Sequence, residues 1–120
     1  MPILGYKKQF APLVEWVIKR QTIRAYGKRK FKVGDKLYSY AGVRTKHCYS
    51  LGVFMLKSIG HVVITQEGVI LFEDGKMRIL YDIEEKQKFA RADGFKDWPT
   101  MVAWFGKTHG LPFAGIILRW

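Results

Sequence analysis

The chain has 120 residues and a mass of 14.0 kDa, and 48% of its residues are hydrophobic. A chain of this length and hydrophobic content can form one domain over residues 1–120, with a core that needs no disulfide or structural metal. The same composition excludes a disordered tail. No apolar run reaches the roughly 18 residues of a membrane span, and a lone cysteine, Cys48, favours a reducing, cytoplasmic location.

The first predicted element is a helix. Apolar residues recur at helical spacing at Phe10, Leu13, Val14 and Val17. Pro12 suits the first turn of this helix, which we expect to fade near residues 19–21 before residues 22–24 become β-like. Residues 27–35 then predict a basic loop with a tight turn, followed by a strand over 36–41.

The rest of the chain predicts strands and one more helix. We expect strands at residues 53–56, 61–65, 69–72, 77–81 and 113–120, because these runs are rich in β-branched and aromatic residues. Asp74-Gly75 is a hairpin signal. Residues 98–108 predict a helix with Asp97 as its N-cap and a stop near Gly110. The order is typical of an α+β domain with a barrel-like sheet of five or six strands and two or three helices.

Conventional catalytic and metal-binding motifs are mostly absent. His47, His61 and His109 have no second ligand at metal-binding spacing, so we expect no metal and no cofactor. His47 and Cys48 would point to opposite faces of a strand, which excludes a thiol–imidazole dyad, and we expect a buried or half-exposed Cys48. No glycine-rich phosphate loop is present.

The segment from residue 19 to 24 is the most informative for chemistry. If it is extended, Thr22 and Arg24 share one face while Ile23 turns into the core. Lys19, Thr22 and Arg24 would then offer a cation, a hydroxyl and a planar guanidinium, which suit a phosphate and the polar edge of a nucleobase. The alternative is a solvated cluster of charge at the end of a helix.

The charge is distributed unevenly. The formal net charge is +11, and residues 1–60 hold thirteen Lys or Arg against two acids, whereas residues 61–120 hold eight of each. A one-sided basic field attracts polyanions. Nucleic acid suits it better than a membrane surface, because no basic amphipathic helix of useful length is visible. The alternative is a solvated basic face without a specific partner.

Cations and tyrosines in the first half are candidate nucleic-acid contacts. We expect backbone contacts from Arg20, Lys28, Arg29, Lys30, Arg44 and Lys46. Contact with about five phosphates of a single strand predicts a log–log salt slope of about −3 to −4. Tyr26, Tyr38, Tyr40 and Tyr49 offer faces on which bases stack. Tyr38 and Tyr40 lie on the same face of their predicted strand, and this face lines either the cleft or the core. A helical spacing, typical of residues that pack in the core, is found for Trp16, Trp98 and Trp104.

Several segments occur in the order found in a known family. They are residues 7–14, 19–24, 33–38, 45–46 and 92–95, then Trp98, Met101 and the strand 113–120. The chain thereby resembles the ASCH domain family of the PUA-like superfamily, in particular its short phage and prophage members. The resemblance implies a β-barrel of five or six strands flanked by helices, with a cleft between the Thr22–Arg24 strand and the helices. Related PUA-like domains bind RNA, and some read modified bases in such a cleft.

The resemblance also implies an enzymatic alternative. A few small bacterial ASCH proteins are amidohydrolases that remove the acyl group from acetylcytidine nucleosides. Their Lys-x-x-Thr motif matches Lys19 and Thr22, with threonine as nucleophile and lysine lowering its pKa. Their third residue, a glutamate, falls on Asp93, whose side chain is one methylene shorter. Asp93 could instead cap the turn before Gly94 or pair with a basic side chain.

Three hypotheses follow. The first is a module that binds RNA or another single-stranded nucleic acid, because a charge of +11 exceeds what a hydrolase of a neutral nucleoside needs. The second is an amidohydrolase of a modified nucleoside that uses Lys19, Thr22 and Asp93. The third is a phage accessory protein with a protein partner. The pattern favours no particular oligomeric state and does not separate RNA from DNA.

Overall fold

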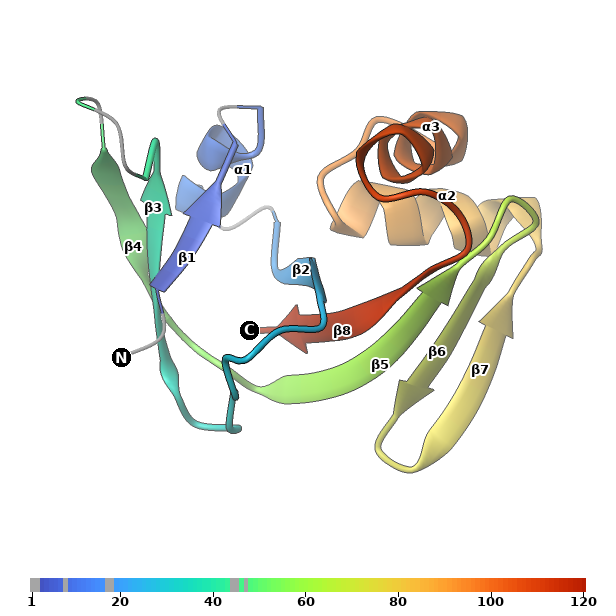
Figure 1. Cartoon of the computed structure of the whole chain (residues 1–120), viewed down its shortest axis with the longest axis horizontal. Coiled ribbons are helices and arrows are strands. Elements are labelled where there is room, and N and C mark those ends of the chain that lie inside the picture. The colour runs from blue at the N-terminus through green and yellow to red at the C-terminus, as the bar shows by residue number, and fades with distance from the viewer. Residues whose placement is uncertain (1–2, 8, 17–18, 44–45, 47) are drawn as a thin grey trace.

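The computed structural model describes residues 3–7, 9–16, 19–43, 46 and 48–120 (Figure 1). Its helices and strands are β1 (Ile3–Tyr6), α1 (Ala11–Glu15), β2 (Gln21–Ala25), β3 (Lys36–Ala41), β4 (Tyr49–Met55), β5 (Ser58–Ile64), β6 (Val69–Glu73), β7 (Lys76–Leu80), α2 (Ile83–Ala92), α3 (Trp98–Thr108) and β8 (Phe113–Arg119). Within these ranges the fold is α+β, with eight strands in two sheets and three helices. None of these helices is long and apolar enough to cross a membrane.

The strands form two open sheets. The smaller sheet has the order β1-β3-β4, and β1 runs parallel to β3. The larger sheet has the order β2-β8-β5-β6-β7 and is antiparallel throughout. The described residues close no barrel, so the expected sheet of five or six strands is corrected to separate sheets of three and five. The pattern missed β1 because a strand of four residues carries little periodicity.

The buried hydrophobic residues form one cluster that includes residues of both sheets and of all three helices, and α2 and α3 lie over one face of the larger sheet (Figure 1). Phe105 of α3 packs against Phe113 of β8, with 5.0 Å between ring centroids and 43° between the ring planes. Strand β8 is an inner strand of the larger sheet because it pairs with both β2 and β5, and its Ile117 is completely buried. Helix α2 was not predicted, since it buries only Phe89 and Ala90 and therefore shows little apolar pattern.

Local signals in the second half are confirmed. Helix α3 begins after Asp97, whose Oδ1 accepts a hydrogen bond from the backbone N–H of Thr100 at 2.8 Å. The β6–β7 hairpin turns at Asp74 and Gly75, which have φ angles of 53° and 73°. Two successive residues with positive φ match the turn that an Asp-Gly pair favours between antiparallel strands.

The first helix differs from its prediction. Helix α1 ends at Glu15, and the backbone N–H of Lys19 bonds to the carbonyl of Leu13 at 2.9 Å instead of continuing the helix. This bond turns Lys19 inward, so that it is only 3% exposed. Trp16, expected to pack, is 76% exposed, and that prediction is wrong.

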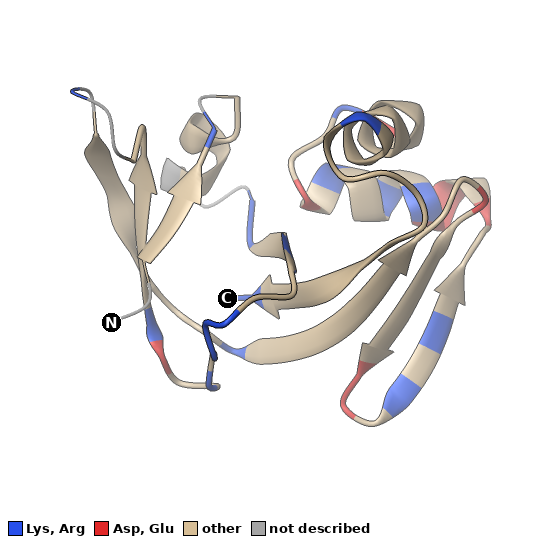
Figure 2. Cartoon of the chain, viewed as in Figure 1, with Lys and Arg blue, Asp and Glu red and all other residues tan. Residues whose placement is uncertain are grey.

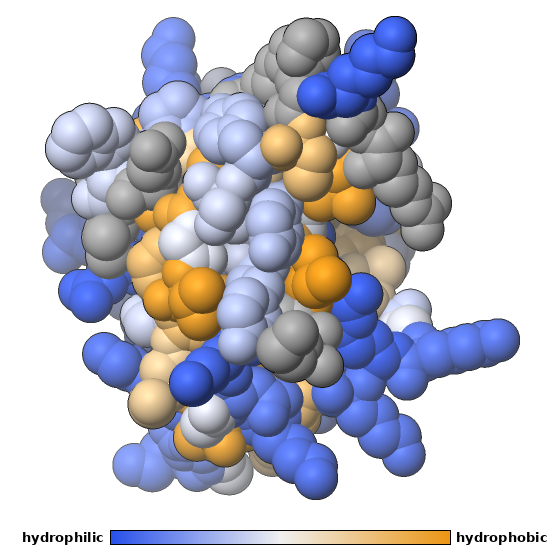
Figure 3. Space-filling view, turned by 90° about the vertical axis from the view of Figure 1, so that its left-hand side faces the viewer, coloured by the Kyte–Doolittle hydropathy of each residue, from blue (hydrophilic) through white to orange (hydrophobic). Residues whose placement is uncertain are grey.

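The smaller sheet presents an outer face to solvent. In β3 the buried residues are Leu37, Ser39 and Ala41, so Tyr38 and Tyr40 lie on the opposite, half-exposed face. Figure 3 looks on to this side of the molecule and shows apolar side chains between more hydrophilic ones. Cys48, expected to be buried or half-exposed, is exposed.

Candidate functional site

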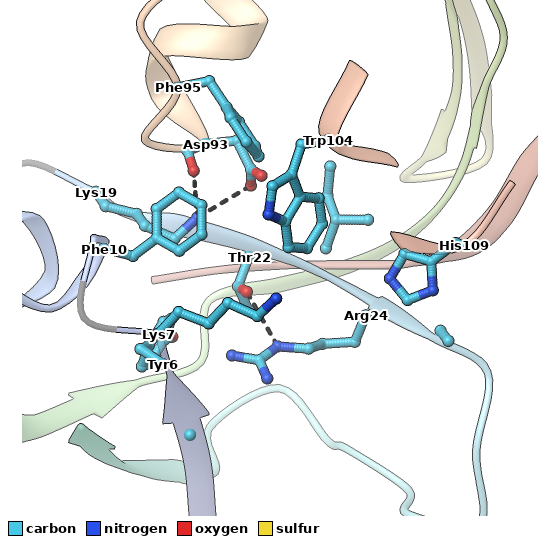
Figure 4. A pocket seen from close by; sticks show the side chains of 13 residues that line it. Tyr6, Lys7, Phe10, Lys19, Thr22, Arg24, Asp93, Phe95, Trp104 and His109 are labelled. Atoms are coloured by element: carbon cyan, nitrogen blue, oxygen red, sulfur yellow. Dashed lines mark hydrogen bonds and ion pairs between the residues drawn. The ribbon is translucent and has the colours of Figure 1, made fainter. Parts of the chain in front are cut away.

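A cavity of about 220 Å³ lies where β1, β2, the end of α2 and α3 approach one another (Figure 4). Aromatic side chains form one wall: Phe10, Phe95 and Trp104. Their ring centroids are 5.2–6.2 Å apart, and the rings meet at angles of 58–82°. Such a cluster presents both faces and edges of rings to a flat ligand.

Gly94 shapes this wall. It has a φ of 94°, and a Cβ atom there would lie 2.9 Å from the Phe10 ring. A residue other than glycine would therefore strain the backbone and displace Phe10. The turn at Gly94 carries the chain from the end of α2 to Phe95, and so positions the aromatic wall.

A buried ion pair forms the deep side of the cavity. The ammonium of Lys19 donates to the backbone carbonyl of Asp93 at 2.5 Å and to its Oδ1 at 3.2 Å. Both residues are at most 4% exposed. Burial lowers the pKa of Lys19 and raises the pKa of Asp93, in each case against the opposing attraction of the partner. Each group is thereby brought closer to its neutral form.

The ion pair belongs to a longer polar network. The Gln21 amide donates to Asp93 Oδ1 at 3.4 Å, and Gln21 Oε1 accepts from Arg119 Nη1 at 2.7 Å. Arg119 also donates from Nε to Glu73 Oε1 at 2.7 Å. The network links the end of α2 to β2, β8 and β6, so the geometry of the cavity depends on residues far from it.

Thr22 and Arg24 form the polar edge. Both line the cavity, and as alternate residues of β2 they share a face of the strand. Ile23 is partly buried against the core and also contributes to the lining. Arg24 Nε donates to Thr22 Oγ1 at 3.0 Å, and the guanidinium lies 4.9 Å from the centroid of the Tyr6 ring (Figure 4). These two contacts fix the guanidinium before any ligand arrives.

Tyr6 adds a buried hydroxyl. It lines the cavity and is 7% exposed, and among the described residues its hydroxyl makes no hydrogen bond. Burial raises the pKa of Tyr6 to about 12, although the nearby Arg24 guanidinium opposes the shift. A buried hydroxyl without a partner is costly unless water or a ligand satisfies it.

The cavity is cationic. Its described lining holds Lys7, Lys19 and Arg24 against one acid, Asp93, which is already bonded to Lys19. The Lys7 ammonium lies 4.9 Å from the centroid of the Trp104 ring. In this lining, two cations therefore have no carboxylate partner, which favours an anionic group on a ligand.

The structure separates the predicted site residues into two groups. Lys19, Thr22, Arg24 and Asp93 meet at the cavity, although residues 19 and 93 are 74 positions apart. The others lie elsewhere: Arg20, Lys28, Arg29, Lys30 and Lys46 are exposed away from the cavity, Tyr40 lies on the outer face of the smaller sheet, and Arg44 is outside the described residues. In the described ranges, no group of three or more His, Cys, Asp or Glu side chains could hold a metal ion.

Sequence reasoning missed most of the aromatic and basic lining. The sequence does not predict Lys7, Phe10, Phe95 and His109 as site residues, and it predicts Trp104 only as a packing residue. Trp104 does pack on Phe105, with 4.9 Å between centroids, but it also lines the cavity. Helical spacing is the same for a residue that fills the core and for one that walls a cavity beside it, so the pattern could not separate them.

Comparison with known proteins found no family model, no curated protein and no solved structure that matches this chain. The residues of the cavity are therefore the guide to its ligand. They can stack on a flat ring, bond to its polar edge and attract an attached anion.

Proposed function

We propose that the protein is a nucleic-acid-binding module that takes one nucleobase of an RNA or other single strand into this cavity. The observation that carries the proposal is the aromatic wall facing a fixed hydroxyl–guanidinium pair, Thr22 and Arg24, in a lining with excess positive charge. Stacking on aromatic side chains contributes about 1–3 kcal/mol per base. Base edges that are not paired in a duplex are free to bond to such side chains.

The distribution of charge supports the same proposal. Five Lys or Arg lie within residues 24–32, without an acid, whereas six of the ten acidic residues lie within residues 67–85. Figure 2 shows the basic run in the loop that follows β2, and shows acidic residues at the β6–β7 turn and near the start of α2. A polyanion held at β2 would therefore meet cations and avoid most of the acids.

We also propose, from the sequence resemblance, that the fold is a PUA-like domain of the ASCH type. The position of the cavity supports this assignment, because it lies between the Thr22–Arg24 strand and the helical elements. The two open sheets would then correspond to the curved sheet that closes into a barrel in that superfamily.

The proposal is tested by fluorescence anisotropy with a short labelled single-stranded RNA at several salt concentrations. Arg24→Ala should weaken binding strongly, and Thr22→Val, which keeps the shape of the side chain, should weaken it about 2- to 10-fold, the range for one lost hydrogen bond. The matched control is Arg78→Ala, which removes the same charge from exposed β7. Salt-independent binding, or equal losses in Arg24→Ala and Arg78→Ala, would contradict the proposal.

One observation favours a second candidate, an amidohydrolase of acylated nucleosides. Lys19, Thr22 and Asp93 line the same cavity, and the pKa shifts of the buried pair bring both groups toward neutral forms suited to proton transfer. Thr22 Oγ would attack the acyl carbon and give up its proton, and the released exocyclic amine would gain one. Water would then cleave the acyl-threonine ester to release acetate.

The contacts of these residues differ from the pairing that the family resemblance implies. Among the described residues, Lys19 donates to Asp93, while Thr22 Oγ1 accepts from Arg24, and no hydrogen bond joins Lys19 to Thr22. Acetate release from acetylcytidine, abolished by Thr22→Ala and unaffected by Lys30→Ala on the exposed loop, would establish the hydrolase. If the protein binds the RNA but releases no acetate, the hydrolase is excluded and the binding module is the function that remains.

A further inference from the structure

A second hollow adjoins the cavity along β2. It is a groove of about 160 Å³ whose walls include Leu4, Arg24, Arg29, Phe31 and Ile116. Arg24 and Ala25 line both spaces, so the groove and the cavity are neighbours on either side of these two residues. A ligand that enters the cavity and extends past Arg24 therefore runs into this groove.

Arg29 is held at the far side of the groove. Its Nη1 donates to the backbone carbonyl of Ile3, and its guanidinium lies 6.0 Å from the centroid of the Phe31 ring. A guanidinium has five N–H groups, and among the described residues only this one contact uses any of them. The side chain is thus oriented by β1 while most of its donors stay available to a phosphate.

Phe31 and the local charge complete the groove. Phe31 is partly buried against the core, which fixes its ring as part of the wall. Of the described residues that line the groove, none is acidic. An aromatic ring beside two guanidinium groups combines a stacking surface with anion binding, which is the chemistry of a nucleotide rather than of an isolated base.

We infer that this groove binds the nucleotide next to the one whose base enters the cavity, so that the ligand is an oligonucleotide and not a free nucleoside. The inference rests on the proposed function. Arg24, shared by both spaces, binds the phosphate that links the two nucleotides. Phe31 stacks on the second base, and Arg29 binds the phosphate beyond it.

The experiment compares a nucleoside monophosphate, a dinucleotide and a trinucleotide by isothermal titration calorimetry. The dinucleotide should bind at least about fivefold more tightly than the monophosphate, which is the lower end of what one stacked base contributes. Phe31→Leu should remove this gain while leaving monophosphate binding unchanged. Arg29→Ala should weaken the trinucleotide and reduce its salt slope by about one phosphate contact.

Lys28→Ala is the matched control, because it removes one exposed charge from the same loop but does not line the groove. It should keep the gain from monophosphate to dinucleotide. Equal affinity of the wild type for all three ligands would overturn the second subsite and leave the cavity proposal intact. Equal losses of affinity for all three ligands in Phe31→Leu would have the same consequence. Failure of all three ligands to bind would overturn both proposals. Circular dichroism of each variant separates a lost contact from a lost fold.

Discussion

Removing the Lys19 ammonium should destabilise the protein through the charge it leaves behind. In Lys19→Met the side chain keeps a similar length, but the Asp93 carboxylate loses its ion-pair partner at 3.2 Å. Asp93 is 4% exposed and so has little access to water, and among the described residues the Gln21 amide is the side-chain donor that remains. A buried carboxylate without a cationic partner either stays ionised, which costs several kcal/mol of stability, or binds a proton.

The expected magnitude is large for a domain of this size. Breaking a buried ion pair by removing one partner costs about 3–5 kcal/mol. An unfolding entropy of about 2.1 cal/mol/K per residue gives roughly 0.25 kcal/mol/K for the whole chain of 120 residues. The Tm of Lys19→Met should therefore fall by about 12–20 °C at neutral pH.

The stability lost in Lys19→Met should depend on pH. Burial raises the folded pKa of Asp93 above its ordinary 3.8, and Lys19→Met removes the cation that opposes this rise. Above pH 3.8 the folded variant then binds more protons than the unfolded chain, so its stability falls as pH rises through the folded pKa. The destabilisation relative to the wild type should be smallest in acid and largest at neutral pH.

Thermal unfolding followed by circular dichroism from pH 4 to pH 8 measures both effects. The matched control is the double variant Lys19→Met with Asp93→Asn, which removes the charge as well as its partner and should be more stable than Lys19→Met alone at neutral pH. A loss of Tm that is the same at every pH, and the same in the double variant, would refute the charge-based explanation. The cost would then come from packing alone.

Four further substitutions test the fold, each by the change in Tm. Asp97→Ala removes the cap of α3 and should cost about 1 kcal/mol, or about 4 °C. Gly115→Ala places a Cβ 2.3 Å from the carbonyl of Arg24, so it should push β2 from β8 and cost about 1–3 kcal/mol or more, whereas Gly27→Ala, with nothing within 4 Å, should stay within about 0.5 kcal/mol. Trp16→Ala should also change stability by less than about 0.5 kcal/mol, because the side chain is 76% exposed. A large loss in Trp16→Ala or Gly27→Ala would contradict these assignments.

Elements with strong local signals were predictable from the sequence. The Asp97 cap, the Asp74-Gly75 hairpin and the helix 98–108 depend on residues within a few positions of one another. β1 and α2 were not predictable in the same way. β1 has four residues and gains its stability from pairing with β3, and α2 is held by the packing of its Phe89–Ala90 end. Their structure is decided by partners distant in sequence.

Part of the candidate site, the polar edge formed by Thr22 and Arg24, was predictable from the sequence. Thr22 and Arg24 share a face because alternate residues of a strand do so, and that geometry needs no tertiary information. Asp93 was named only through the family resemblance, since no spacing rule links it to Lys19 across 74 positions. The aromatic wall was not predictable for the same reason. Phe10 and Trp104 are far apart in sequence, and they meet only after the sheets have positioned α1 and α3.

The buried pair also limits what mutagenesis of the cavity can prove. Lys19 and Asp93 hold the end of α2 against β2, so a Lys19 variant that loses activity has lost structure as well as a reacting group. Thr22→Val has no such ambiguity. Among the described residues its hydroxyl makes one side-chain hydrogen bond, which it accepts from a half-buried Arg24, so the fold should survive the change. If Thr22→Val abolishes acetate release while RNA binding falls by less than about tenfold and Tm is unchanged, the hydroxyl is a nucleophile. If it weakens only binding, the hydroxyl is a recognition group.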